Sequence, residues 1–197
     1  IGRSAASAKE FELATGKSVR TGGVAHELLN CGAPDQAIIA ASFEQLANVA
    51  IELIKAGTRK ILLEKPGGLG LQEILVLQQT AKQYQAEVFI GYNRRFYAAT
   101  AYARDEIAKD GGATSCVFEF TEWAHTIATL ALGEGVKEAW VIANSTHVAD
   151  LAFHLCGIPK EWKSWHSGEM DWHPAAARFC GSGVTEQDIL FSYHADW

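Results

Sequence analysis

Lys65 has the setting in this chain that most strongly suggests chemistry. It stands in the tripeptide Glu64-Lys65-Pro66, directly after the apolar run 61–63, which predicts a short buried strand of a parallel sheet. Open α/β sheets bind their ligands at the carboxyl ends of the strands, and Pro66 restricts the backbone just beyond the lysine. Lys65 is therefore a candidate proton donor or substrate clamp. The alternative is a surface lysine that follows a strand.

His147 is the second candidate. A polar residue among 144–146 can cap a helix that carries His147, Asp150 and His154 at i, i+3 and i+7, and this spacing places all three on one side. A histidine near a helix start, with a carboxylate one turn on to orient it, suits general acid or base catalysis near neutral pH. The spacing leaves three interpretations open: a catalytic base, a set of metal ligands, or a buried polar helix face.

The composition is that of an ordinary globular protein. The chain has 197 residues, of which 48% are hydrophobic and 20% charged, and its net charge is -6, so a basic face that would bind nucleic acid is not expected. The sequence contains no apolar run long enough to span a membrane. Four cysteines without a Cys-x-x-Cys pair indicate reduced thiols in a cytoplasmic protein. No metal site is predicted.

Short apolar strands alternate with helices in the first half. This pattern predicts a parallel, doubly wound α/β sheet. The expected helices are 4–16, 23–31, 44–56 and 71–84, and the expected strands are 36–41, 60–63 and 87–91.

The pattern changes after Gly91. One further helix, 95–109, is followed by strand-like runs that loops separate, which predicts a second, α+β domain with a mainly antiparallel sheet. The expected strands are 113–123, 161–167, 175–180 and 189–197. The expected boundaries are 1–93 for a partial first domain and 94–197 for a partial second domain. Both ends of the chain look cut, so we expect a fragment of a longer protein.

Four segments in order, 37–42, 60–66, 91–96 and 147–150, resemble the successive motifs of the Gfo/Idh/MocA oxidoreductases, the group of glucose-fructose oxidoreductase and inositol dehydrogenase. The resemblance extends from the first residues to about Gly157. It implies a Rossmann domain, here without its first strand and glycine-rich loop, joined to a sheet domain that also serves for subunit contacts. It further implies a nicotinamide cofactor, a sugar or nucleotide-sugar substrate and a homo-oligomer.

The resemblance also implies catalytic roles. His147 would exchange the hydroxyl proton of the substrate, Asp150 would orient His147, and Lys65 would hydrogen-bond the reacting oxygen. The chain departs from the family at Ala143, where many members have an aspartate, and at Leu46, where a histidine is typical. A non-catalytic regulator that senses a dinucleotide or a sugar on the same scaffold is therefore the alternative function.

The cofactor is expected at the strand ends. The predicted contacts are Arg3, Ser4, Ala41, Ser42, Phe43, Glu64 and Lys65. An arginine where the second strand of a Rossmann fold ends accommodates a 2'-phosphate, so Arg3 favours NADP over NAD. The alternative is that Arg3 is a solvated residue at a helix start.

Aromatic residues beside histidines are frequent in the second half, and flat rings beside polar groups suit sugar binding. The predicted substrate contacts are Asn93, Arg94, Trp123, His125, Trp172 and His173, and the pair Trp165 and His166 has the same character. The alternative is that the tryptophans belong to the core. Arg94 and Arg95 are candidates for a clamp on a carboxylate or phosphate, and the alternative for one of them is an ion pair between domains.

Overall fold

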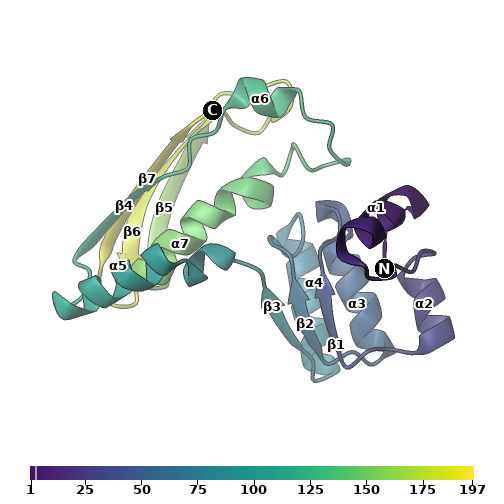
Figure 1. Cartoon of the computed structure of the whole chain (residues 1–197). Helices are drawn as coiled ribbons and strands as arrows, with labels where there is room; N and C mark the ends of the chain where they lie inside the picture. Colours follow the sequence, from purple (N-terminus) through teal and green to yellow (C-terminus); the bar gives the residue numbers. More distant parts are fainter. Residues whose placement is uncertain (3) are drawn as a thin grey trace. The chain divides into compact units, whose positions relative to one another are not determined.

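The computed structural model describes residues 1–2 and 4–197 (Figure 1). The predicted cofactor contact Arg3 lies outside these residues. The chain divides into two compact units, the first formed by Ile1–Gly67 with Leu71–Ile90 and the second by Gly68–Gly70 with Gly91–Trp197. No helix of the described residues has the length and apolar character needed to cross a membrane.

The first unit contains a three-stranded parallel sheet in the order β1-β2-β3, as the alternating pattern predicts. Its strands are β1 (Gln36–Ile39), β2 (Lys60–Leu63) and β3 (Glu87–Ile90). Its helices are α1 (Ala5–Thr15), α2 (Val24–Cys31), the single turn η1 (Phe43–Gln45), α3 (Leu46–Ala56) and α4 (Leu71–Gln83). The predicted α/β fold is confirmed for this unit.

The core of this unit lies between the sheet and α3 with α4, which cover the same face (Figure 1). Leu46, Ala50 and Leu53 of α3 are buried at helical spacing. The opposite face of the sheet is open: Ile38 is 79% exposed and Phe89 is 58% exposed. Helices α3 and α4 pack on the other face, so these side chains point away from the core.

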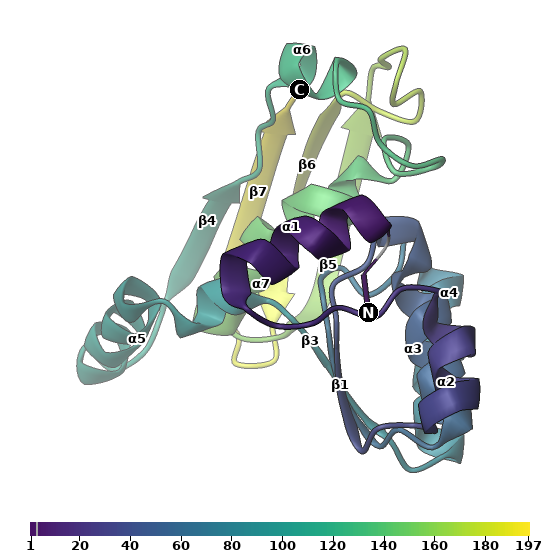
Figure 2. The same ribbon diagram turned by 45° about the vertical axis from the view of Figure 1, so that its right-hand side comes forward.

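The second unit contains a four-stranded sheet in the order β4-β7-β6-β5 (Figure 2). Its strands are β4 (Ser115–Glu119), β5 (Pro159–Ser167), β6 (Arg178–Thr185) and β7 (Leu190–Asp196). Its helical segments are η2 (Asn93–Phe96), α5 (Ala98–Lys109), α6 (Ala124–Ala128), the π-helix η3 (Val141–Ser145) and α7 (Thr146–Cys156). The pairings β5-β6 and β6-β7 are antiparallel and β4-β7 is parallel, so the sheet is mainly antiparallel, as predicted.

Helix α7 packs on one face of this sheet, which we call the inner face. Phe153 of α7 contacts the rings of Phe118 and Phe191, with ring centroids 5.5 and 5.1 Å away. The strand β6 presents Gly181 to this face, where a Cβ atom would meet the ring of Tyr193 at 2.5 Å. Glycine at this position lets an aromatic ring of β7 lie across the neighbouring strand.

Three local expectations differ from the structure. The helix expected over 95–109 is interrupted at Tyr97, which has an extended backbone between η2 and α5. The strand expected over 175–180 runs later, over Arg178–Thr185. The cap expected at 144–146 is also wrong, because the helix already begins before Asn144 and continues through the π-helix into α7.

Candidate functional site

Lys65 lies at the carboxyl end of β2, as expected, and is only 7% exposed. Its Nζ atom stands 5.2 Å from the centroid of the Phe43 ring, which follows β1. The backbone between these ends is fixed, since the Glu64 amide donates to the carbonyl of Ile39 at 2.8 Å. A desolvated ammonium over an aromatic face is an electrostatically stabilised cation. The surface alternative for Lys65 therefore does not describe this structure.

Ala41 and Ser42 are exposed in the turn after β1, and Glu64 is exposed before Lys65. The Ser42 hydroxyl donates to Oε1 of Glu44 at 2.7 Å, and this hydrogen bond lowers the pKa of the Glu44 carboxyl. Small exposed side chains at a strand end leave the backbone accessible to a ligand. Three of the predicted cofactor contacts thus lie on an open sheet edge.

Ser4 has a local structural role. Its side chain caps α1 by accepting the backbone N–H of Ser7, and the Ser7 side chain completes a capping box.

His147 lies in the first turn of α7, against Tyr92. The two rings meet edge to face with centroids 5.9 Å apart. Burial raises the pKa of Tyr92, and a weaker opposing effect comes from its hydrogen bond with Thr146. Tyr92 therefore remains a neutral phenol at physiological pH. It belongs to the motif 91–96, but sequence reasoning did not single it out as a site residue.

Asp150 lies one turn after His147, where the helical spacing places it. Both of its carboxylate oxygens accept hydrogen bonds from Arg95, with Nε 2.8 Å from Oδ2 and Nη2 close to Oδ1. The pair raises the pKa of Arg95, and the Asp150 side chain is only 10% exposed. Arg95 thus forms its ion pair within the second unit.

Glu122 is a further acidic residue that sequence reasoning missed. It follows β4, and its Oε1 accepts hydrogen bonds from Nδ2 of Asn144 at 2.8 Å and from Oγ of Ser145 at 3.0 Å. These two residues close the π-helix immediately before the turn of His147. A π-helix inside a helical segment often marks a functional position. The sequence carries no local pattern that would connect positions 122 and 144.

The predicted substrate contacts fall into different places in the second unit. Trp123 and His125 stack with ring centroids 6.3 Å apart, and Trp123 is 74% exposed. His173 is buried, with Nδ1 2.8 Å from the carbonyl oxygen of Ala176, and Trp172 stacks on Trp197. His173 is therefore part of the buried interior and Trp172 is half-buried against Trp197, whereas Trp123 and His125 are accessible.

Asn93 and Arg94 lie in η2. Asn93 is exposed, and the carbonyl oxygen of Arg94 accepts the hydroxyl of Thr100 at 2.7 Å. Asn93 is thus accessible to a ligand, and the hydrogen bond at Arg94 involves its backbone rather than its guanidinium.

An aromatic cavity of about 320 Å³ lies between the first turns of α7 and the inner face of the sheet. Its walls include Thr146, Phe118 and Trp162, together with Trp165 and His166 of the predicted aromatic pairs. The other predicted pairs do not line it.

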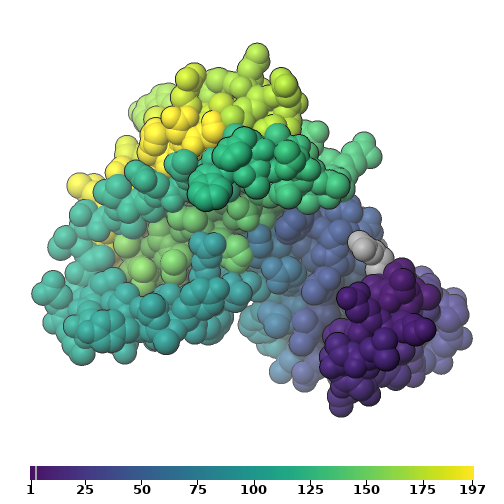
Figure 3. Space-filling view, turned by 45° about the horizontal axis from the view of Figure 1, so that its top comes forward, coloured from purple at the N-terminus to yellow at the C-terminus, as the bar shows by residue number. Residues whose placement is uncertain are grey.

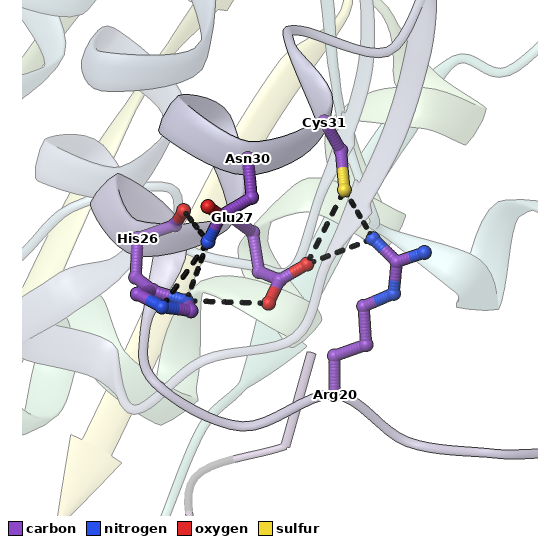
Figure 4. A network of polar contacts seen from close by, with 5 residues as sticks. All are labelled: Arg20, His26, Glu27, Asn30 and Cys31. Atoms are coloured by element: carbon purple, nitrogen blue, oxygen red, sulfur yellow. Dashed lines mark hydrogen bonds and ion pairs between the residues drawn. The ribbon is translucent and has the colours of Figure 1, made fainter.

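A separate polar network lies in the first unit around α2 (Figure 4). Arg20 donates to Glu27 at 3.0 Å and lowers the pKa of that carboxyl, and it also contacts the thiol of Cys31. The contacts hold the segment before α2 against the helix. Nowhere in residues 1–2 and 4–197 do three or more His, Cys, Asp or Glu side chains gather so that they could hold a metal ion.

Compared by sequence, the chain matches no protein-family model and no curated protein. Compared by structure, it is similar to the WlbA dehydrogenase of Bordetella pertussis, solved with NADH and UDP-GlcNAcA. The TM-score is 0.74 and the identity 14%, over 97% of this chain and 60% of the other. The chain therefore spans less than two thirds of the length of that enzyme.

It is also similar to levoglucosan dehydrogenase, solved with NADH and levoglucosan, with a TM-score of 0.72 and 17% identity over 99% of this chain and 56% of the other. A third similar structure is a putative myo-inositol dehydrogenase of Sinorhizobium meliloti, with a TM-score of 0.69 and 18% identity over 98% of this chain and 58% of the other. The chain therefore has the fold of these dehydrogenases over the length that it spans.

Proposed function

We propose that this chain acts as an NAD(P)-dependent oxidoreductase of the Gfo/Idh/MocA type, working on CH–OH groups of a sugar or nucleotide sugar in the cytoplasm. The observation that carries the proposal is the buried ammonium of Lys65 at the carboxyl end of β2. It occupies the edge where open α/β sheets bind ligands. Support comes from the shared fold, since two of the similar dehydrogenases hold NADH together with a sugar or nucleotide sugar.

The residues at this edge fit a nicotinamide dinucleotide by their chemistry. Ala41 and Ser42 are small and exposed, and Lys65 supplies a cation beside the ring of Phe43. This combination offers open backbone next to a positive charge, which suits an anionic ligand that carries flat rings. We propose Ala41, Ser42, Phe43 and Glu64 as the cofactor contacts, with NADP preferred over NAD.

The protein side of the reaction is a proton transfer. A bound nicotinamide would accept the hydride when substrate is oxidised, and His147 would accept the hydroxyl proton. Lys65 donates a hydrogen bond to the oxygen that gains negative charge. The hydrogen bonds from Arg95 fix the side chain of Asp150 one helical turn from His147. Asn93, Arg94, Trp123 and His125 are proposed as substrate contacts.

The assay uses the complete protein with NAD or NADP and a panel of UDP-sugars, levoglucosan and myo-inositol. Lys65→Met and His147→Asn should each lower turnover by roughly a hundredfold or more. The matched controls are Lys60→Met, on the same strand with an exposed ammonium, and His194→Asn, at an exposed position of β7. Full turnover in either test variant would reject that residue's assignment. Dinucleotide binding without turnover of any sugar would favour the regulator.

A further inference from the structure

Glu122 contacts the turn of helix that presents His147, although it lies in the segment between β4 and α6. Asn144 and Ser145 both donate to the same carboxylate oxygen, Oε1, at 2.8 and 3.0 Å. Ser145 is only 3% exposed. A buried hydroxyl that loses its partner is costly, so this contact constrains the position of the turn.

The backbone on both sides of Glu122 is itself fixed. The Phe120 amide donates to the carbonyl of His194 at 3.3 Å, and the Asp196 amide donates to Oγ1 of Thr121 at 3.4 Å. On the other side, the carbonyl of Trp123 accepts the first amide bonds of α6. Figure 3 shows the teal segment around α6 beside the yellow end of β7. Glu122 therefore reaches η3 from a rigid support.

The turn that Glu122 contacts has an unusual hydrogen-bond pattern. The Thr146 amide bonds to the carbonyl of Val141, five residues back, and the Thr146 hydroxyl donates to the carbonyl of Ile142 at 2.8 Å. A π turn departs from the regular α-helical hydrogen-bond ladder, and such turns occur frequently at functional sites. The side-chain contacts at residues 144 and 145 act on this irregular turn, which leads directly into the turn with His147.

We propose that Glu122 is a positioning residue for His147. Its carboxylate binds Asn144 and Ser145, holds the π-helix in register, and thereby directs the His147 ring toward its reactive orientation. Asp150, one turn further along α7, accepts hydrogen bonds from Arg95 through both of its oxygens. The inference rests on the proposed function of His147.

The test compares Glu122→Ala with Glu122→Gln in the complete protein. A glutamine keeps an oxygen that can accept both hydrogen bonds, so Glu122→Gln should stay within about threefold of the wild-type kcat. Glu122→Ala should lower kcat by about a hundredfold, the scale of a misplaced reacting group, with the KM for the dinucleotide unchanged. Glu119→Ala, an exposed glutamate of β4, is the matched control.

Asn144→Ala should also lower kcat, and the double variant should be no slower than Glu122→Ala alone, since Glu122→Ala already removes the contact with Asn144. Additive losses would overturn the proposal, as would equal kcat values in Glu122→Ala and Glu119→Ala.

A second readout does not need turnover. In protein labelled with ¹⁵N-histidine, the ring signals of His147, assigned by their loss in His147→Asn, should broaden or shift in Glu122→Ala and recover in Glu122→Gln. Unchanged signals in Glu122→Ala would overturn the inference even if no sugar is turned over. The proposed function fails separately, by full turnover in His147→Asn.

Discussion

Arg95 and Asp150 are 55 positions apart in sequence and form an ion pair within the second unit. The guanidinium donates to both carboxylate oxygens, and the acidic partner is largely buried. Such a bidentate pair has strict geometry, and loss of Arg95 removes the charged partner of a largely buried carboxylate. At the scale of single residues, the pair connects η2 to α7.

We predict that Arg95→Ala and Asp150→Ala each lower the free energy of unfolding. The double variant should be less destabilised than the sum, with a coupling energy of about 1 kcal/mol or more, because each single change already breaks the pair. Urea unfolding of the four proteins measures this coupling. Strict additivity would show that the two residues stabilise the fold independently.

We expect the ionisation of Tyr92 to make the free energy of unfolding depend on pH. Burial raises its pKa above the ordinary value of 10.0, so the unfolded chain releases this proton first as the pH rises. The stability that this pKa shift contributes is present below about pH 10, and it is lost as the pH rises through the pKa of Tyr92 in the folded protein.

The measurement is urea unfolding at about pH 9 and about pH 11. Wild type should lose more stability over this interval than Tyr92→Phe, which keeps the ring against His147 but cannot ionise. The Cys116 thiol, whose pKa folding raises from 9.0 to about 12, also makes stability depend on pH in this range. It is present in both proteins, so only the difference between them reports on Tyr92. Equal losses would contradict the assignment.

At the scale of elements, β4 and α7 contact each other through the thiols of Cys116 and Cys156. Burial, together with a hydrogen bond to Cys156, raises the pKa of Cys116 to about 12. Cys116 belongs to the inner face of the sheet, and Cys156 ends α7 and is buried. The thiolate is the reactive form, so the raised pKa protects Cys116, while burial limits access to Cys156.

We expect iodoacetamide at neutral pH to alkylate Cys31 at least roughly tenfold faster than Cys116 or Cys156. Cys31 is exposed and serves as the internal standard. Mass spectrometry of tryptic peptides over time gives the three rates in one sample. Comparable rates at Cys31 and Cys116 would mean that β4 and α7 separate readily in solution.

At the scale of the whole molecule, the sheet of the second unit has apolar residues on the face opposite α7. Val117 is 76% exposed and Leu190 is 65% exposed. Exposed apolar side chains on an open sheet face are one feature of surfaces that bind another protein. We propose that this face forms the contact between copies in a homo-oligomer.

Val117→Glu in the complete protein should therefore lower the molar mass measured by light scattering to that of the monomer. Leu13→Glu is the control, because Leu13 is an exposed apolar residue of α1. An unchanged mass in Val117→Glu would place the contact between copies elsewhere or exclude it.

The local periodicity of apolar residues in the sequence was sufficient to predict most helices and strands. The stripe in α3 and the apolar runs of β1 to β3 determine helix and strand because burial repeats every 3.6 or every two residues along the chain. The position of Lys65 follows from the same information, since a strand that ends at Leu63 leaves the next residues at its carboxyl edge.

The tertiary structure decided the contacts between distant positions. Three examples are the ion pair of Arg95 with Asp150, the hydrogen bonds of Glu122 to η3, and the burial of His173. No regular spacing in the sequence predicts any of them. The same holds for the parallel pairing of β4 with β7. Periodicity records which face of an element is apolar, whereas packing decides which elements meet and which polar groups then become partners.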